Sequence, residues 1–265
     1  MARLAREEGR RLFGLDTAAY ERGRPGHAEE VYDVLRERCG LDDGTKVLEI
    51  GPGTGQATRR LLELGADPLV GIEPDGALAD LVRERFGGRV EIRESTLEDA
   101  ELESDFALAT AASSFHWVDE AVGLARIAAA LRPGSWIALW WTGFGDANRP
   151  DPFREAIDPL MEGVPRGPAE AEDRRPFAHD AGTRIAALER AGFVDVLPRR
   201  VEWWHTWDAE GIRALFGSFS PLLSLDPDRR QALLDSIAEI AVRDFGGQVT
   251  KPVVTALYTA RKPDR

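Results

Sequence analysis

The stretch KVLEIGPGTGQATRRLLELG, residues 46–65, decides the predicted fold. It opens with the apolar run KVLEI, turns through Gly51, Gly53 and Gly55, and continues in a helix-period pattern from Gln56. Glycines allow the backbone to turn sharply and to approach a ligand closely, and open α/β sheets bind ligands at the carboxyl ends of their strands. An ordinary tight turn is the alternative interpretation of a glycine cluster taken by itself.

Outward from this stretch, short apolar runs alternate with helix-period segments. The runs cover residues 46–50, 68–73, 89–93, 106–111 and 136–141, and the helical segments between them cover 56–64, 76–86 and 120–131. Alternation at this pace predicts right-handed crossovers and a parallel, doubly wound sheet covered on both faces. Pro133-Gly134 is predicted to be a turn that separates the last helix from its strand.

After Phe144 the composition changes. Residues 145–180 are rich in proline, glycine and charge, with one short helix candidate at 153–162, and they are interpreted as a connector. The remaining pattern predicts a helix at 183–191, an extended stretch at 194–207, two helices at 208–219 and 226–245, and a strand at 253–260.

Charge and cysteine content exclude several classes of protein. The 265 residues carry 46 Asp and Glu against 34 Lys and Arg, a net charge of −12. A nucleic-acid or anionic-membrane partner is disfavoured, because such proteins usually carry a basic footprint. The single cysteine, Cys39, cannot form an internal disulfide, and without an HExxH motif or a close His/Asp cluster no metal site is expected. No apolar run reaches 18 residues, so the prediction is a soluble cytoplasmic protein.

An acidic residue completes the pattern of a nucleoside site. Glu73 ends the second predicted strand, where a carboxylate can grip a ribose diol. In the dinucleotide fingerprint G-x-G-x-x-G the third glycine would stand one residue later, at the position of Gln56. A nicotinamide-dependent oxidoreductase is therefore the weaker of two interpretations.

The pattern E-x-G-x-G-x-G at Glu49–Gly55 resembles motif I of the class I S-adenosylmethionine-dependent methyltransferases. Further segments resemble the small-molecule methyltransferases of the type 11 group, and the similarity covers about residues 13–262. These segments are YERGRPG at 20–26, GIEPD at 71–75, FHWVD at 115–119, LRPG at 131–134, and the stretches 203–207 and 250–261.

The resemblance implies a Rossmann-like class I α/β fold. Its seven-stranded, mostly parallel sheet has an antiparallel last strand near 253–260, and a helical cap is inserted. A single domain is expected over 1–265, as a monomer or homodimer. Its parts are an N-terminal lid at 1–40, a cofactor-binding core at 41–144, a connector with helix and strand at 145–207, the cap at 208–247, and the final strand and tail at 248–265.

The resemblance also implies roles for the cofactor site, which would bind S-adenosylmethionine and release S-adenosylhomocysteine. The glycine turn would face the methionine part, Glu73 the ribose and Pro74 the adenine. Many relatives carry Gly-Asp after the third strand, whereas this chain has Ser95-Thr96, so adenine recognition is expected from backbone groups. The implied set is Tyr20, Arg24, Glu49, Gly51, Gly53, Gly55, Gln56, Glu73, Pro74, Thr96, Leu97 and Ala112. Tyr20 and Arg24 would begin a lid, or would only pin the N-terminal segment.

The acceptor is predicted to be a small organic molecule. His116 is the candidate general base, because it follows a strand at the catalytic end of the sheet. A structural histidine wedged between Phe115 and Trp117 is the alternative. Trp141, Phe144 and Trp207 would surround an apolar or planar acceptor, or would fill the core. A cofactor-binding module without catalysis is the interpretation from another class.

Overall fold

The computed structural model describes residues 17–146, 148–165 and 177–264. Contacts divide the chain into two compact units. Within the described residues, the helical unit comprises 17–26, 143–146, 148–165 and 202–254, and the sheet unit comprises 27–142, 177–201 and 255–264. Residues 1–16 of the predicted lid and 166–176 of the predicted connector lie outside the described residues. The predicted single domain and its internal boundaries stay a prediction.

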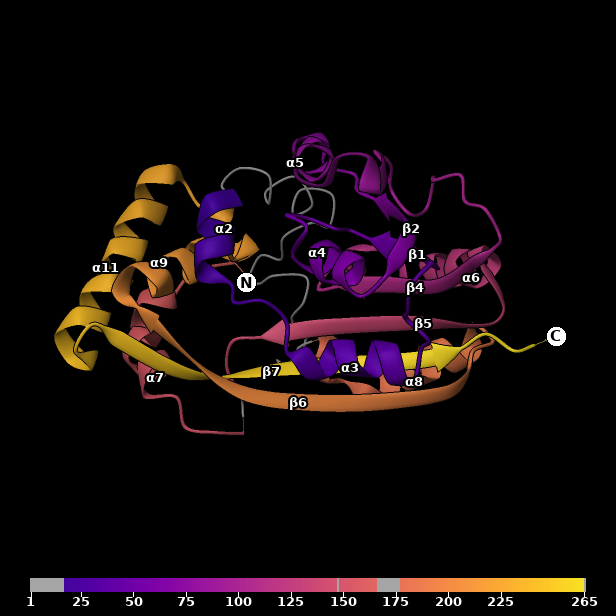
Figure 1. Ribbon diagram of the computed structural model, residues 1–265. Coiled ribbons are helices and arrows are strands. Elements are labelled where there is room, and N and C mark those ends of the chain that lie inside the picture. The colour runs from indigo at the N-terminus through magenta and orange to yellow at the C-terminus, as the bar shows by residue number, and fades with distance from the viewer. Residues whose placement is uncertain (1–16, 147, 166–176, 265) are drawn as a thin grey trace. The chain divides into compact units, whose positions relative to one another are not determined.

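Seven strands form one sheet in the order β3-β2-β1-β4-β5-β7-β6. The pairs β1–β2, β1–β4, β2–β3 and β4–β5 are parallel. Strand β7 runs opposite to β5 and β6 (Figure 1), which confirms the predicted mostly parallel sheet with an antiparallel last strand. The strands are β1 Thr45–Ile50, β2 Ala66–Ile72, β3 Val90–Arg93, β4 Phe106–Ala112, β5 Leu131–Gly143, β6 Val194–Asp208 and β7 Gln248–Arg261.

Helices of the sheet unit follow the predicted alternation. Helix α4 begins directly after the glycine turn, at Gln56. The α-helices are α3 Glu29–Glu37, α4 Gln56–Glu63, α5 Gly76–Phe86, α6 Glu120–Ala130 and α8 Ala181–Arg190, and the 3-10 helices are η2 Gly87–Arg89, η3 Phe115–Trp117 and η5 Phe177–His179. Side chains of α6 and α8 share one core cluster with strand residues such as Leu139 and Trp141. The neighbouring Trp140 points to the other face, where its ring packs edge-on against Tyr32 of α3 with 6.3 Å between the ring centres.

The prediction of a turn at Pro133-Gly134 is wrong, because both residues lie inside β5. Phe106 pairs with Leu131 and Leu108 pairs with Trp136, so residues 132–135 bulge opposite a single residue of β4. A bulge tolerates the missing proline N–H, and Gly134 adopts a φ of +78° there. The strand therefore starts five residues before the apolar run that predicted it.

The helical unit is built from α2 Thr17–Gly23, α7 Pro152–Ile157, η4 Asp158–Met161, α9 Ala209–Gly217, α10 Ser220–Leu223 and α11 Pro227–Phe245. Helix α9 packs against α2 and α11, and α11 also contacts α7. The predicted helix at 208–219 ends early, because Ser218 closes α9 and Phe219 precedes a new helix with Pro221 in its first turn. Among the described residues, no helix combines the length and apolar character that a membrane span needs.

Candidate functional site

The glycine turn joins β1 to α4 in a shape that needs glycine. Gly51 has a φ of +67°, and a Cβ there would lie 2.6 Å from the Cβ of Ser114. Gly53 has a φ of +60°, but no described atom would lie within 4 Å of its Cβ. The turn is therefore crowded against the protein at Gly51 and open at Gly53, where a ligand can approach the backbone.

Three side chains that the sequence analysis did not single out hold this turn. Ser114 Oγ donates a hydrogen bond to the Ile50 carbonyl, and Arg85 Nη1 donates to the Thr54 carbonyl at 2.9 Å. Thr58, in the first turn of α4, donates to the carboxylate of Glu49 at 2.7 Å. Only Thr58 is close enough in the sequence to be recognised as a partner of the turn.

Glu73 lies directly after β2, and its side chain connects the turn to the next loop. One carboxylate oxygen accepts a hydrogen bond from the Gly53 N–H at 3.0 Å, and the other accepts from the Asp75 N–H at 3.1 Å. The residue is only 5% exposed. Burial raises the pKa of Glu73 to about 7, against the lowering effect of the two backbone hydrogen bonds.

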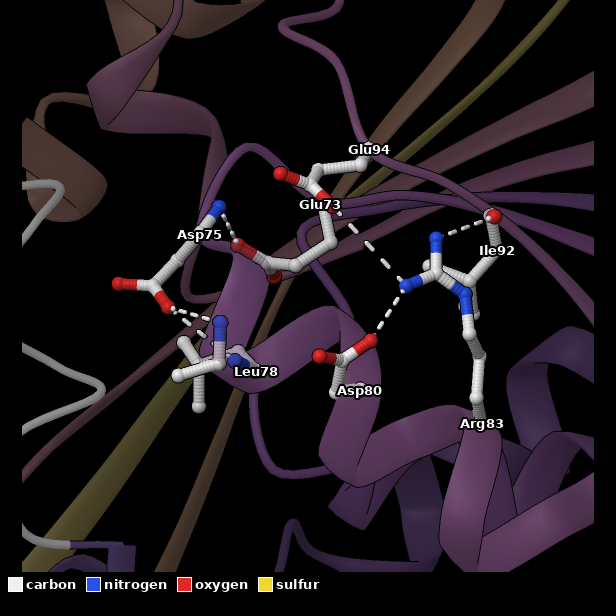
Figure 2. A network of polar contacts seen from close by, with 8 residues as sticks. Glu73, Asp75, Leu78, Asp80, Arg83, Ile92 and Glu94 are labelled. Carbon is white, nitrogen blue, oxygen red and sulfur yellow. Dashed lines mark hydrogen bonds and ion pairs between the residues drawn. The ribbon is translucent and has the colours of Figure 1, made fainter.

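Figure 2 shows the polar contacts between α5 and the segments next to Glu73. Asp75 caps this helix by accepting from the Ala77 and Leu78 N–H groups at 3.0 and 3.1 Å. Arg83 donates to the Ile92 carbonyl at 3.1 Å and forms an ion pair with Asp80 at 2.7 Å. It also lies 4.0 Å from a Glu94 oxygen. The helix is thereby tied to the end of β3, and exposed Pro74 is left between Glu73 and the cap.

Glu49 is the second buried carboxylate, with 1% exposure. Its Oε2 accepts from Thr58, whereas Oε1 has no hydrogen-bond partner among the described residues. Burial, with a smaller contribution from the charge of Glu73, raises the pKa of Glu49 to about 7 against the lowering effect of the Thr58 hydrogen bond. An unpaired buried acceptor at the base of the turn favours a ligand that brings a hydrogen-bond donor or a positive charge.

Thr96 and Leu97, which are predicted to flank an adenine, follow β3, and Ala112, which is predicted to offer its carbonyl to the cofactor's amine, is the last residue of β4. The Thr96 hydroxyl is already engaged, since it donates to Asp99 Oδ2 at 2.7 Å and accepts from the Asp99 N–H at 3.2 Å. Leu97 points into the core, and Ala112 is half-buried where β4 ends. Recognition of an adenine by backbone groups near Thr96 and Leu97 stays a prediction.

His116 lies in η3, after β4, and contacts two tryptophans. Trp141 Nε1 donates a hydrogen bond to His116 Nδ1 at 3.1 Å. The imidazole ring centre lies 4.9 Å from that of Trp117. Trp141 itself is 6% exposed and belongs to the core cluster of the sheet unit. The structure thus joins a candidate base and a candidate acceptor contact that are 25 positions apart in the sequence.

The other four candidates, Tyr20, Arg24, Phe144 and Trp207, belong to the helical unit. The Arg24 guanidinium lies 4.6 Å from the Tyr20 ring centre and 5.6 Å from that of Phe144. It donates to the Ser218 hydroxyl at 2.9 Å and to the Ser218 carbonyl at 3.2 Å. Arg24 therefore pins the chain after α2 to the end of α9, and a role toward a cofactor stays a prediction.

Comparison with known proteins identifies the family. Residues 47–134 match the family model of a methyltransferase domain. An uncharacterized methyltransferase of Geobacillus kaustophilus is 31% identical over 166 residues, which cover 56% of this chain and 71% of that protein. The chain belongs to the methyltransferase family. A second relative, an uncharacterized methyltransferase of Mycobacterium tuberculosis, is 35% identical over 130 residues, 49% of this chain and 51% of that protein. This methyltransferase thus spans about half the length of the mycobacterial relative.

Solved structures share the fold of this methyltransferase at low sequence identity. Phosphoethanolamine N-methyltransferase 2 of Haemonchus contortus, in complex with phosphomonomethylethanolamine and S-adenosylhomocysteine, has a TM-score of 0.57 at 14% identity, covering 98% of this chain and 60% of that one. The [4+2]-cyclase SpnF has a TM-score of 0.57 at 18% identity, covering 99% and 98%. Because a methyltransferase and a cyclase share it, the fold alone does not specify the reaction.

Proposed function

We propose that this methyltransferase transfers a methyl group from S-adenosylmethionine to a small organic acceptor. The observation that carries the proposal is the buried Glu73 carboxylate, which binds the Gly53 N–H of the open glycine turn. A nucleoside with a ribose diol and no pyrophosphate suits this arrangement, because the turn offers a carboxylate at the position where the diol is gripped.

The residues present fit such a cofactor. Each Glu73 oxygen accepts one backbone hydrogen bond and has capacity for a ribose hydroxyl as well. The open space over Gly53 admits a ligand against the backbone, and the unpaired Glu49 Oε1 favours the cationic amino end. Exposed Pro74 is available to an adenine ring, with the backbone near Thr96 and Leu97 at its edge.

The cofactor supplies a methyl group on a sulfonium, so the leaving group is already activated. The chain has to bind and orient both partners and exclude water. In this proposal Gly51, Gly53, Gly55, Gln56 and the Ala112 carbonyl face the methionine part. Tyr20 and Arg24 serve the lid, and Phe144 and Trp207 serve the acceptor. The small size of the acceptor is supported by the net charge of −12, which disfavours nucleic acid.

Isothermal titration with S-adenosylhomocysteine tests the proposal. We expect wild-type protein to bind, and Glu73→Gln to bind roughly 10- to 100-fold more weakly, since hydrogen bonds to a charged acceptor contribute about 1.5–3 kcal/mol. Glu91→Gln, an exposed carboxylate on β3, is the matched control and should bind like wild type.

The pH dependence provides a second readout. Because burial raises the pKa of Glu73 to about 7, affinity should increase as the pH rises through neutrality and the carboxylate ionises. Folded wild-type protein that releases no heat with S-adenosylhomocysteine, but enhances NADH fluorescence, would favour the oxidoreductase interpretation instead.

A further inference from the structure

We infer that His116 acts as a hydrogen-bond donor through Nε2–H and not as a general base, and that an oxygen acceptor of the methyl group is therefore an already ionised carboxylate. The inference rests on the proposed function, whose site it deepens. It starts from the hydrogen bond that Trp141 Nε1 donates to His116 Nδ1 at 3.1 Å.

The indole of Trp141 is held in place. Its ring contacts Phe177 at 5.4 Å and Tyr258 at 6.1 Å between centres, both in edge-on geometry. The Tyr258 hydroxyl donates to the Ala178 carbonyl at 2.5 Å, which holds that neighbour as well. With 6% of its surface exposed, Trp141 cannot swing its N–H away from His116 without opening the core.

A fixed indole N–H selects one tautomer of the imidazole. Indole nitrogen is a donor only, so Nδ1 has to present its lone pair, and the neutral ring carries its proton on Nε2. A proton on Nδ1 would direct one N–H against another inside the core. The contact with the Trp117 ring at 4.9 Å further restrains the imidazole plane. Trp141 is thus a positioning residue for His116.

A general base needs a lone pair directed at the acceptor. The Nδ1 lone pair of His116 is directed at Trp141, and Nε2 already carries a proton. Toward an acceptor the ring can only donate, which stabilises an anionic oxygen. Carboxylates have pKa values near 4 and are ionised at neutral pH without a base, whereas an alcohol is not.

The methyl transfer then balances without proton loss. One carboxylate oxygen forms a bond to the methyl carbon while the carbon–sulfur bond breaks and its electron pair returns to sulfur. The products are a methyl ester and the neutral thioether. The second carboxylate oxygen, or the first as it approaches, accepts from Nε2–H and is oriented by it.

The tautomer is tested directly by long-range 1H–15N correlation spectra of protein with 15N-labelled histidine, bound to S-adenosylhomocysteine. The chain has 4 histidines, and the signal missing in His116→Gln identifies this one. In the wild type we expect a proton on Nε2 alone. In Trp141→Phe, which keeps an aromatic ring but removes the indole N–H, we expect a mixture of both tautomers. A proton on Nδ1 in wild type would overturn the inference.

Activity tests the acceptor class with matched pairs: benzoate against benzyl alcohol, and cinnamate against cinnamyl alcohol, with methyl-labelled S-adenosylmethionine. We expect methyl esters from the acids only. His116→Gln, which retains an N–H near the Nε2 position, should retain roughly tenfold more turnover than His116→Asn, which lacks that reach. Turnover of an alcohol that disappears in both variants would contradict the inference but leave the proposed function standing. Absence of S-adenosylhomocysteine binding would instead remove the proposed function.

Discussion

At the scale of single residues, two buried carboxylates dominate the site. Glu49 and Glu73 both have pKa values raised to about 7, mainly by burial. Glu73 is compensated by two backbone N–H groups, whereas Glu49 has one hydroxyl donor and one oxygen without a hydrogen-bond partner in the part of the chain that the structure describes. A folded protein that buries such groups without full pairing is less stable when they ionise. This arrangement is consistent with a site that gives up stability for ligand affinity.

The pH dependence of stability measures this effect at Glu49. Its pKa in the folded protein is above the ordinary 4.5, so its stabilising contribution is present at low pH and is lost as the pH rises through about 7. Glu49→Gln removes the titration and should gain up to about 3 kcal/mol in unfolding free energy relative to wild type between about pH 5 and pH 8. Urea unfolding across that range is the measurement. Glu30→Gln, an exposed change on α3, serves as control, and a pH-independent difference for Glu49→Gln would contradict the assignment.

At the scale of elements, the glycine turn combines two separate demands. Gly51 is crowded by Ser114, so its glycine is needed for packing as well as for a left-handed φ. Gly53 faces open space, so its glycine is needed for the φ and for the approach of a ligand. The same turn thereby links the segment between β4 and η3, which contains Ser114, to the end of β1.

Alanine substitutions separate the two demands. Gly51→Ala should lower the unfolding free energy by roughly 2–4 kcal/mol, because backbone strain adds to overpacking against Ser114. Adding Ser114→Gly should recover part of that loss, because it removes the Cβ that lies 2.6 Å away. Gly53→Ala should cost only about 1–2 kcal/mol of strain and weaken S-adenosylhomocysteine binding instead. Thermal unfolding and titration of the three variants provide the comparison, and equal stability losses at both glycines would refute it.

At the scale of the whole molecule, the helical unit has a buried ion pair of its own. In the helical unit Lys251 of β7 is 3% exposed and forms an ion pair with Asp151, the residue that caps α7. Burial lowers the pKa of Lys251, and the Asp151 carboxylate opposes that effect. Removing one partner of such a pair leaves an uncompensated buried charge.

Asp151→Asn should therefore lower the unfolding free energy by about 3–5 kcal/mol, and Lys251→Met by less, because methionine buries no charge beside Phe153. Amide hydrogen exchange should quicken first in residues 148–165 and 202–254, since the pair lies wholly within the helical unit. Asp244 forms an exposed ion pair with Arg243, and the control variant Asp244→Asn should leave amide hydrogen exchange unchanged. Equal acceleration in the sheet unit would show that the pair does not stabilise its own unit selectively.

The sequence by itself determined the strand–turn–helix unit at residues 46–65, the order of strands and helices, and the acidic residue after β2. These features depend on local periodicity and on backbone conformations that neighbouring residues dictate. The long strand β5 was only partly predictable. Proline and glycine at 133–134 indicate a turn, but pairing with β4 places them in a bulge inside β5.

Only the tertiary structure decided which atoms meet. Ser114 against Gly51, Arg85 on the Thr54 carbonyl and Trp141 on His116 join residues from 25 to 63 positions apart. No local pattern encodes these distances, because they arise where parallel strands bring their carboxyl ends to one edge of the sheet. Burial likewise decides the charge of Glu49 and Glu73, since the low dielectric of the core sets a pKa that residue type cannot.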